Sequence, residues 1–201
     1  MAAGREACAG EAADAGGGAM TGLRLFYAIV PSDAVIDDIG TLQWGPSGVH
    51  WTLPDQVHLT LRFLGAVPLA VAEALVGDTR PLTVAPFDLQ LQGVGHFPSR
   101  GAAKVLWSGV RDDTPLQALR TALDKRLQAQ GISPTAERLR PHVTVGRVRG
   151  ADDGALAAWL ASHGLYRSET FPVRAVELFR SELRPEGSEY TRLGRLRLSA
   201  G

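Results

Sequence analysis

The feature that most constrains the fold of this chain is a short unit that occurs twice. The unit reads HLTL from His58 and HVTV from His142, so each copy is histidine, aliphatic, threonine, aliphatic. Because side chains alternate between the two faces of a strand, each copy has one apolar face and one face with an imidazole beside a hydroxyl. Helical signals follow each copy, from Pro68 and from Asp152. The spacing of the copies is too long for a solenoid, and the repeat predicts two similar lobes.

Strand and helix patterns alternate along the rest of the chain, which predicts a fold of the α+β class. Apolar runs bounded by turn residues indicate strands, and apolar residues at helical spacing indicate helices. Two consecutive strands, over 87–95 and 103–110, are expected to be hairpin partners or neighbours. The other expected strands span 23–31, 57–65, 142–148, 171–181 and 188–198, and the expected helices span 32–44, 68–78, 114–131 and 152–164.

Length and composition limit the organisation of the chain and its partners. The chain has 201 residues, and Lys+Arg and Asp+Glu both number 21, so bulk charge gives no case for sequence-independent binding of nucleic acid. Residues 1–22 are rich in Ala and Gly, and we expect a disordered extension there, with Met20 as an alternative start. The single Cys8 lies in this extension, which excludes an intrachain disulfide. A single domain is expected over 23–201, in the cytoplasm, because no signal peptide or long apolar run is present.

Two histidines in matching units suit the opening of a phosphodiester without a metal ion. One group must take a proton from the attacking oxygen and another must protonate the leaving oxygen, and imidazole titrates near neutrality. If the two units face each other across a cleft, His58 and His142 flank the phosphorus. The hydroxyls of Thr60 and Thr144 can then donate to its non-bridging oxygens. No two of the five histidines have the spacing of a metal-binding pair, so neither a metal site nor another cofactor is expected.

These units and several further blocks resemble the two-histidine (2H) phosphoesterases, in particular the bacterial and archaeal RNA 2′,3′-cyclic phosphodiesterases, historically called 2′-5′ RNA ligases. The similar blocks extend from Leu23 to about Leu198 and are RLFYAIVP, WTLPDQVHLTLRFLG, GVGHFP, KVLWSGV, RPHVTVGRV and FRSELRPEGSEYTRL. The resemblance implies a bilobal fold, in which two pseudo-symmetric lobes with antiparallel sheets line a central cleft and helices lie outside. It also implies hydrolysis of a ribose 2′,3′-cyclic phosphate to a 2′-phosphomonoester, with His58 as proton donor and His142 as proton acceptor.

Two arginines are further candidates for binding the substrate. Arg147 fits the arginine position of the family's second motif, although strict alternation turns it away from the cleft unless Gly146 introduces a bulge. Arg62 has the strand parity of His58, and a solvated arginine at a strand end is the simpler interpretation for it. Either guanidinium could hold a phosphate with two parallel hydrogen bonds.

Aromatic residues and the other histidines complete the set. Phe26, Tyr27 and Tyr190 are candidates for stacking on a base, and core packing accounts for them equally well. The remaining histidines have no partner at an informative spacing and are expected to be surface residues: His50, His96 and His163.

The sequence leaves alternative functions open. The leading hypothesis is an enzyme that acts on RNA or nucleotide termini with a cyclic phosphate. A module that binds RNA phosphate ends without turnover is an alternative, but a matched acid and base favour the enzyme. The same fold could also act on ADP-ribose cyclic phosphate or on 2′-5′-linked oligonucleotides, including reversible 2′-5′ RNA ligation. A monomer without membrane association or an obligate protein partner is expected.

Overall fold

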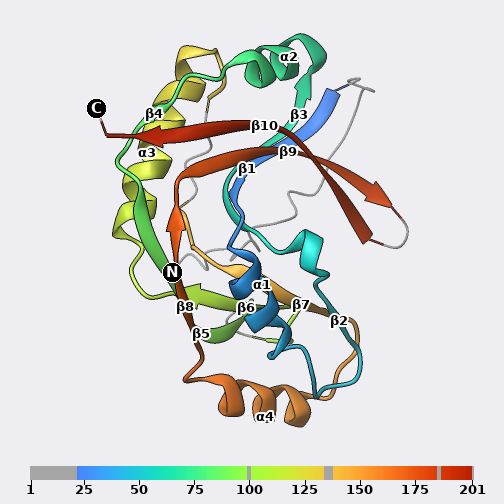
Figure 1. The fold of residues 1–201 in the computed structure, drawn as a ribbon. Helices are drawn as coiled ribbons and strands as arrows, with labels where there is room; N and C mark the ends of the chain where they lie inside the picture. The colour runs from blue at the N-terminus through green and yellow to red at the C-terminus, as the bar shows by residue number, and fades with distance from the viewer. Residues whose placement is uncertain (1–21, 99–100, 134–137, 185–186, 201) are drawn as a thin grey trace, which may run out of the picture.

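The computed structural model describes residues 22–98, 101–133, 138–184 and 187–200, and it has the expected α+β architecture (Figure 1). The predicted extension over 1–22, with Cys8 and Met20, lies outside the described residues except for Gly22, which begins the first strand. The elements in chain order are β1 (Gly22–Ile29), α1 (Asp33–Gly40), β2 (Val49–Trp51), the 3₁₀ helix η1 (Pro54–Gln56), β3 (Leu59–Pro68), α2 (Leu69–Gly77), β4 (Leu82–Thr83), β5 (Phe87–Phe97), β6 (Val105–Val110), α3 (Thr114–Ala129), β7 (Val143–Val148), α4 (Asp153–His163), β8 (Arg167–Val173), β9 (Ala175–Arg184) and β10 (Gly187–Ser199).

The strands form two half-sheets that meet at the two motif strands. The strand order is β4-β10-β9-β1-β3-β7-β6-β5-β8, with β2 paired to β7. We define lobe 1 as the half from β4 to β3 and lobe 2 as the half from β7 to β8 together with β2. The lobes are joined by one residue pair, Leu59 of β3 with Val143 of β7. All pairings are antiparallel except that of β4 with β10, so the bilobal fold implied by the resemblance is present.

Helices α1 and α3 each pack against the lobe that does not contain the strand before them in the chain. Helix α1 follows β1 of lobe 1 but packs against β8 of lobe 2, and α3 follows β6 of lobe 2 but packs against β3 and β4 of lobe 1. Helices α2 and α4 pack on lobe 1 and lobe 2 respectively, and Figure 1 shows α2 with α3 at one end of the molecule and α1 with α4 at the other. The chain is therefore interleaved, and no single cut separates the two lobes.

The apolar faces of the motif strands form part of the core, as the alternation predicts. Leu59 and Leu61 of β3 are 1% exposed, and Val143 and Val145 of β7 are fully buried. Helix α3 contributes a row of buried leucines at helical spacing, namely Leu116, Leu119, Leu123 and Leu127. None of the helices in the described ranges is long and apolar enough to cross a bilayer.

Two kinds of difference from the expected elements have simple causes. The single strand expected over 171–181 is two strands, because the chain leaves β8 of lobe 2 at Arg174 and enters β9 of lobe 1. The buried positions shift by one residue at this change of sheet, from Phe171 and Val173 in β8 to Val176 and Leu178 in β9. The short elements β2, β4 and η1 were not predicted, because two or three residues carry no periodic signal.

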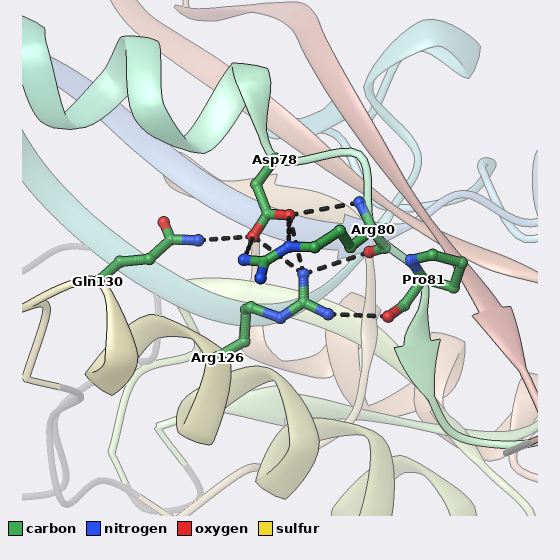
Figure 2. A network of polar contacts seen from close by, with 5 residues as sticks. All are labelled: Asp78, Arg80, Pro81, Arg126 and Gln130. Atoms are coloured by element: carbon green, nitrogen blue, oxygen red, sulfur yellow. Dashed lines mark hydrogen bonds and ion pairs between the residues drawn. The ribbon is translucent and has the colours of Figure 1, made fainter.

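A buried carboxylate fastens the segment between α2 and β4 to helix α3 (Figure 2). Asp78 is 7% exposed and accepts hydrogen bonds from Arg80 Nε at 2.9 Å and from Arg126 Nη1 at 2.9 Å. Gln130 Nε2, just beyond α3, donates to the same carboxylate at 2.6 Å. Arg126 also donates to the backbone carbonyl of Pro81 at 2.8 Å. These bonds fix α3 against lobe 1.

Candidate active site

The two repeated units meet in one cleft at the junction of the lobes. His58 immediately precedes β3 and His142 immediately precedes β7, and the adjacent residues Leu59 and Val143 are paired. The cleft has a volume of about 460 Å³, and both histidines and both threonines of the units line it. The polar faces predicted for the two units therefore come together, with Thr60 and Thr144 beside the imidazoles.

Each histidine is oriented by a hydrogen bond to the backbone two residues before it. His58 Nδ1 lies 2.7 Å from the carbonyl oxygen of Gln56, and His142 Nδ1 lies 2.7 Å from that of Arg140. A carbonyl only accepts, so Nδ1 carries the proton in both rings. In the neutral ring Nε2 then has a free lone pair, and in the charged ring it has a proton to donate. Both imidazoles are thus held in the tautomer that leaves Nε2 for the substrate.

Burial favours the neutral form of both histidines. The pKa of His58 is lowered to about 4, chiefly by burial; the bond to the Gln56 carbonyl opposes the shift, and the nearby His142 and Arg147 contribute to it. Burial also lowers the pKa of His142, and Arg147 adds to this effect. Arg147 lines the same cleft as both imidazoles.

Aromatic rings account for the burial of His58. The ring of Phe26 lies 5.0 Å from the imidazole of His58, and the ring of Tyr190 lies 5.1 Å away, edge to face. His142 has the edge of Phe97 at 5.0 Å. Tyr190 lines the cleft, as expected for a residue that contacts the substrate. Phe26 is 1% exposed, so it supports the imidazole from behind and core packing is the correct interpretation for it.

Tyr27 is buried away from the cleft, so the prediction that it binds the substrate is wrong. It is 2% exposed, and burial raises the pKa of its phenol to about 12, with a smaller contribution from Asp78 on the side of α3. The residue neighbours Phe26 in β1, and alternation places the two rings on opposite faces of the strand. The sequence pattern did not indicate which of the two adjacent aromatic residues would face the site.

Arg147 enters the cleft because β7 contains a bulge, as its predicted role in binding the substrate requires. The register between β6 and β7 shifts by one residue after Thr144, so Val145 is an extra residue. The shift reverses the alternation and turns Arg147 to the side of Thr144, where it lines the cleft. Gly146 is needed beside it, because a Cβ there would lie 2.7 Å from Val49 Cγ1 of β2.

Arg62 points away from the cleft, so its prediction as a substrate-binding residue is wrong. Strand β3 contains the same bulge as β7, with Leu61 as the extra residue opposite β1. Arg62 is therefore turned to the opposite face, where it is 4% exposed and donates from Nε to Asp124 Oδ1 at 2.8 Å. Phe63, which occupies the position in the first unit that Arg147 occupies in the second, lines the cleft instead.

The cleft is cationic although the chain has no net charge. Besides Arg147, three arginines line it: Arg24 and Arg184 from lobe 1, and Arg149 from lobe 2. His50 of β2, predicted only as a surface residue, lines it as well. No Asp or Glu is among the described residues that line the cleft. A phosphate or another anion is the ligand that this set of side chains suits.

The other expected surface histidines lie outside the cleft. His96 belongs to β5, and its Nδ1 is buried without a hydrogen-bond partner among the described residues. His163 ends α4 and contacts the rings of Trp44 and Trp159. Across the described ranges, no group of three or more His, Cys, Asp or Glu side chains is arranged to hold a metal ion.

Comparison with known proteins agrees with this geometry. Residues 31–184 match the family model of the 2′-5′ RNA ligase superfamily. The chain is 31% identical over 184 residues to an RNA 2′,3′-cyclic phosphodiesterase of Methanothermobacter thermautotrophicus, covering 88% of this chain and 99% of that protein. It is also 31% identical over 189 residues to the protein of the same name from Thermus thermophilus, covering 88% of this chain and 90% of that protein.

Solved structures share the fold. The crystal structure of TT0787 from Thermus thermophilus superposes with a TM-score of 0.66 at 28% identity, covering 89% of this chain and 99% of that one. The structure of Escherichia coli LigT with 3′-AMP gives a TM-score of 0.67 at 24% identity, covering 89% and 99%. With the twin histidine units, the two lobes and the match over most of its length, this chain belongs to the 2′-5′ RNA ligase superfamily of 2H phosphoesterases.

Proposed function

We propose that this protein is an enzyme that hydrolyses 2′,3′-cyclic phosphates at RNA or nucleotide ends to 2′-phosphomonoesters. The observation that carries the proposal is the pair of His58 and His142, which line one cleft and both have Nδ1 bonded to a backbone carbonyl. A symmetric pair of this kind provides one acid and one base for a single phosphorus. The name of the relatives that match over most of the chain, RNA 2′,3′-cyclic phosphodiesterase, supports the same activity.

The reaction needs two proton transfers. His142, neutral at Nε2, takes a proton from water as the water oxygen forms a bond to phosphorus. The bond from phosphorus to the 3′ oxygen breaks, and His58 gives that oxygen its Nε2 proton, leaving the phosphate on the 2′ oxygen. Thr60, Thr144 and Arg147 donate to the non-bridging oxygens, where negative charge develops. This assignment of acid and base follows the family resemblance.

His58 must be charged to act as the acid, and the free cleft disfavours that charge. Its pKa of about 4 leaves the imidazole neutral near pH 7. A bound cyclic phosphate brings a negative charge between the imidazoles and raises the pKa of both. We therefore propose that the substrate itself supplies the charge that keeps His58 protonated, and that only one of the two imidazoles is charged at a time.

Product analysis tests the activity directly. We expect the full chain to convert adenosine 2′,3′-cyclic phosphate to the 2′-phosphate in the presence of EDTA, without the 3′-phosphate. His58→Ala and His142→Ala should each lower kcat by roughly 10²–10⁴-fold, the range for an acid–base group, while His163→Ala at the end of α4 is the matched control. Binding without turnover would favour the alternative of a phosphate-end binding module. Loss of activity in EDTA that zinc or manganese restores would contradict a metal-independent reaction.

A substrate with sulfur in place of the 3′ oxygen tests which histidine is the acid. The thiolate leaves without a proton, so this substrate should restore turnover to His58→Ala and not to His142→Ala. The opposite result would reverse the two roles. Action on ADP-ribose cyclic phosphate or 2′-5′-linked oligonucleotides is tested with the same assay, and a cytoplasmic, monomeric state stays a prediction from the sequence.

A further inference from the structure

We propose that Arg149 and His50 form a second phosphate subsite beside the reaction centre, which binds a phosphate on the 5′ side of the cyclic end. This inference rests on the proposed function, because it assigns a second contact to the substrate of the same cleft. Three observations support it: the position of the two residues, the absence of acidic side chains near them among the described residues, and the backbone contacts that hold them in place.

The two residues surround Arg147 on the lobe 2 wall of the cleft. His50 of β2 is the direct cross-strand partner of Arg147, so their Cβ atoms are roughly 5 Å apart. Arg149 lies two residues beyond Arg147, immediately after the end of β7. All three side chains line the cleft. They therefore form one cationic surface that extends outward from the histidine pair.

This surface has no compensating negative charge in the described part of the chain. Several arginines elsewhere have acidic partners, among them Arg62, Arg80, Arg126 and Arg195. No ion pair joins Arg147 or Arg149 to an acidic side chain among the described residues, and no carboxylate lines the cleft. The two guanidinium groups of Arg147 and Arg149 are therefore available to bind an anion.

The number of donors exceeds what one cyclic phosphate needs. A cyclic phosphate carries one negative charge, and Arg147 already lies close enough to lower the pKa of both catalytic imidazoles. Arg149 and His50 are placed farther out along the wall, where a further phosphate of the same ligand would lie. That phosphate is either the diester that precedes the last ribose of an RNA chain or the 5′-phosphate of a free nucleotide.

The backbone holds the subsite in place without a ligand. The backbone N–H of Arg149 donates to the carbonyl of Gly48 at 2.7 Å. Gly48 has φ +78°, and a Cβ on it would lie 2.9 Å from the backbone of Gly150 and Ala151. Only glycine allows this close approach, so the ends of β2 and β7 are locked together. A preformed contact of this kind binds a ligand at a lower entropic cost.

Three adenosine substrates test the subsite: the 2′,3′-cyclic phosphate alone, the same with a 5′-phosphate, and the dinucleotide ending in a cyclic phosphate. In the wild type we expect the second phosphate to raise kcat/KM by roughly ten- to a hundredfold, the effect of one hydrogen bond to a charged group. Arg149→Gln and His50→Gln should each reduce this ratio to about threefold or less. Arg174→Gln, an exposed arginine outside the cleft, is the matched control and should keep the wild-type ratio.

The outcomes separate this inference from the proposed function. If none of the three substrates is hydrolysed, the proposed function fails, and the subsite fails with it. If all are hydrolysed at equal kcat/KM, or if Arg149→Gln leaves the ratio unchanged, the subsite alone is overturned. If kcat/KM rises for the dinucleotide and not for the 5′-phosphate, the subsite binds the diester of an RNA chain. If kcat/KM rises equally for both, the subsite binds the 5′-phosphate of any terminal nucleotide. Arg149→Gln should also make the salt dependence of kcat/KM for the dinucleotide less steep by about one phosphate contact.

Discussion

At the scale of single residues, the two motif histidines are equivalent in the backbone and different in their surroundings. Both have Nδ1 bonded to the carbonyl two residues earlier. His58, however, lies between Phe26 and Tyr190, and its pKa is lowered to about 4. The repeat in the sequence predicts the equivalence, and only the packing of distant strands produces the difference.

The buried neutral state of His58 should be visible in the pH dependence of stability. The unfolded chain binds a proton at this residue near pH 6.5, whereas the folded protein does so near pH 4. The free energy of unfolding is therefore highest above pH 6.5, where His58 is neutral in both states, and it decreases as the pH falls from 6.5 to 4. Relative to His58→Gln, we expect the wild type to lose at most about 3 kcal/mol over this interval, measured by urea unfolding at pH 7.5 and 4.5. Identical pH dependence of the two proteins would contradict the lowered pKa.

The two motif threonines should matter for catalysis and little for folding. Thr60→Val and Thr144→Val keep the β-branched shape and delete the donor. Because each hydroxyl faces the open cleft, we expect kcat/KM to fall about tenfold or more and the free energy of unfolding to change by less than about 0.5 kcal/mol. Thr170→Val, at an exposed position of β8, is the control. Normal kcat/KM in Thr60→Val or Thr144→Val would remove that hydroxyl from the phosphate site.

At the scale of elements, a bulge in each motif strand decides which side chains form the site. The alternation of faces holds from each histidine to its threonine and is then reversed by Leu61 in β3 and Val145 in β7. The two bulges bring Phe63 and Arg147 into the cleft from equivalent positions, one apolar and one cationic. A bulge is set by the pairing with a neighbouring strand, so the motif strand alone did not predict that Arg62 would turn to the core.

The carboxylate of Asp78 is the element-scale contact that we expect to be most sensitive to substitution. Hydrogen bonds from Arg80 and Arg126 hold the pKa of Asp78 well below its usual range. Asp78→Asn leaves Arg126, which is 18% exposed, without its charged partner, and we expect a loss of about 3 kcal/mol. In the wild type this stability is complete above pH 4 and is lost as the pH falls below it, since the unfolded carboxyl then binds a proton. Asp153→Asn on α4 is the control, and equal urea midpoints for the two variants would contradict the expectation.

At the scale of the whole molecule, the crossing of α1 and α3 makes the two lobes depend on each other. They share one residue pair between β3 and β7, which would be a weak connection by itself. Each lobe nevertheless packs against a helix that follows a strand of the other lobe in the sequence. We therefore expect the lobes to unfold together.

The positions of the tryptophans allow this expectation to be tested without substitutions. All four lie in lobe 2 or in contact with its helix α4: Trp44, Trp51, Trp107 and Trp159. Tryptophan fluorescence thus reports on lobe 2, while far-ultraviolet circular dichroism reports on both lobes. We expect the same urea midpoint with both probes. A lower or higher midpoint by fluorescence would show that the lobes unfold separately.

The sequence by itself determined the class of the fold, the family and the two histidine–threonine pairs, because these depend on local patterns. Alternation over the three residues from each histidine to its threonine places His58 with Thr60 and His142 with Thr144. Most strands and helices were predicted within a few residues for the same reason, and the family match over residues 31–184 confirmed the resemblance.

Tertiary structure alone decided which other residues belong to the site, because their orientation depends on partners that are distant in sequence. Arg62 is held by Asp124 of α3, Tyr27 is buried in the core outside the cleft, and Arg147 needs the register between β6 and β7. The cationic cleft is also a tertiary property. Equal numbers of acidic and basic residues predict no attraction for nucleic acid, yet the fold gathers four arginines around one cleft and leaves no carboxylate among the described residues that line it.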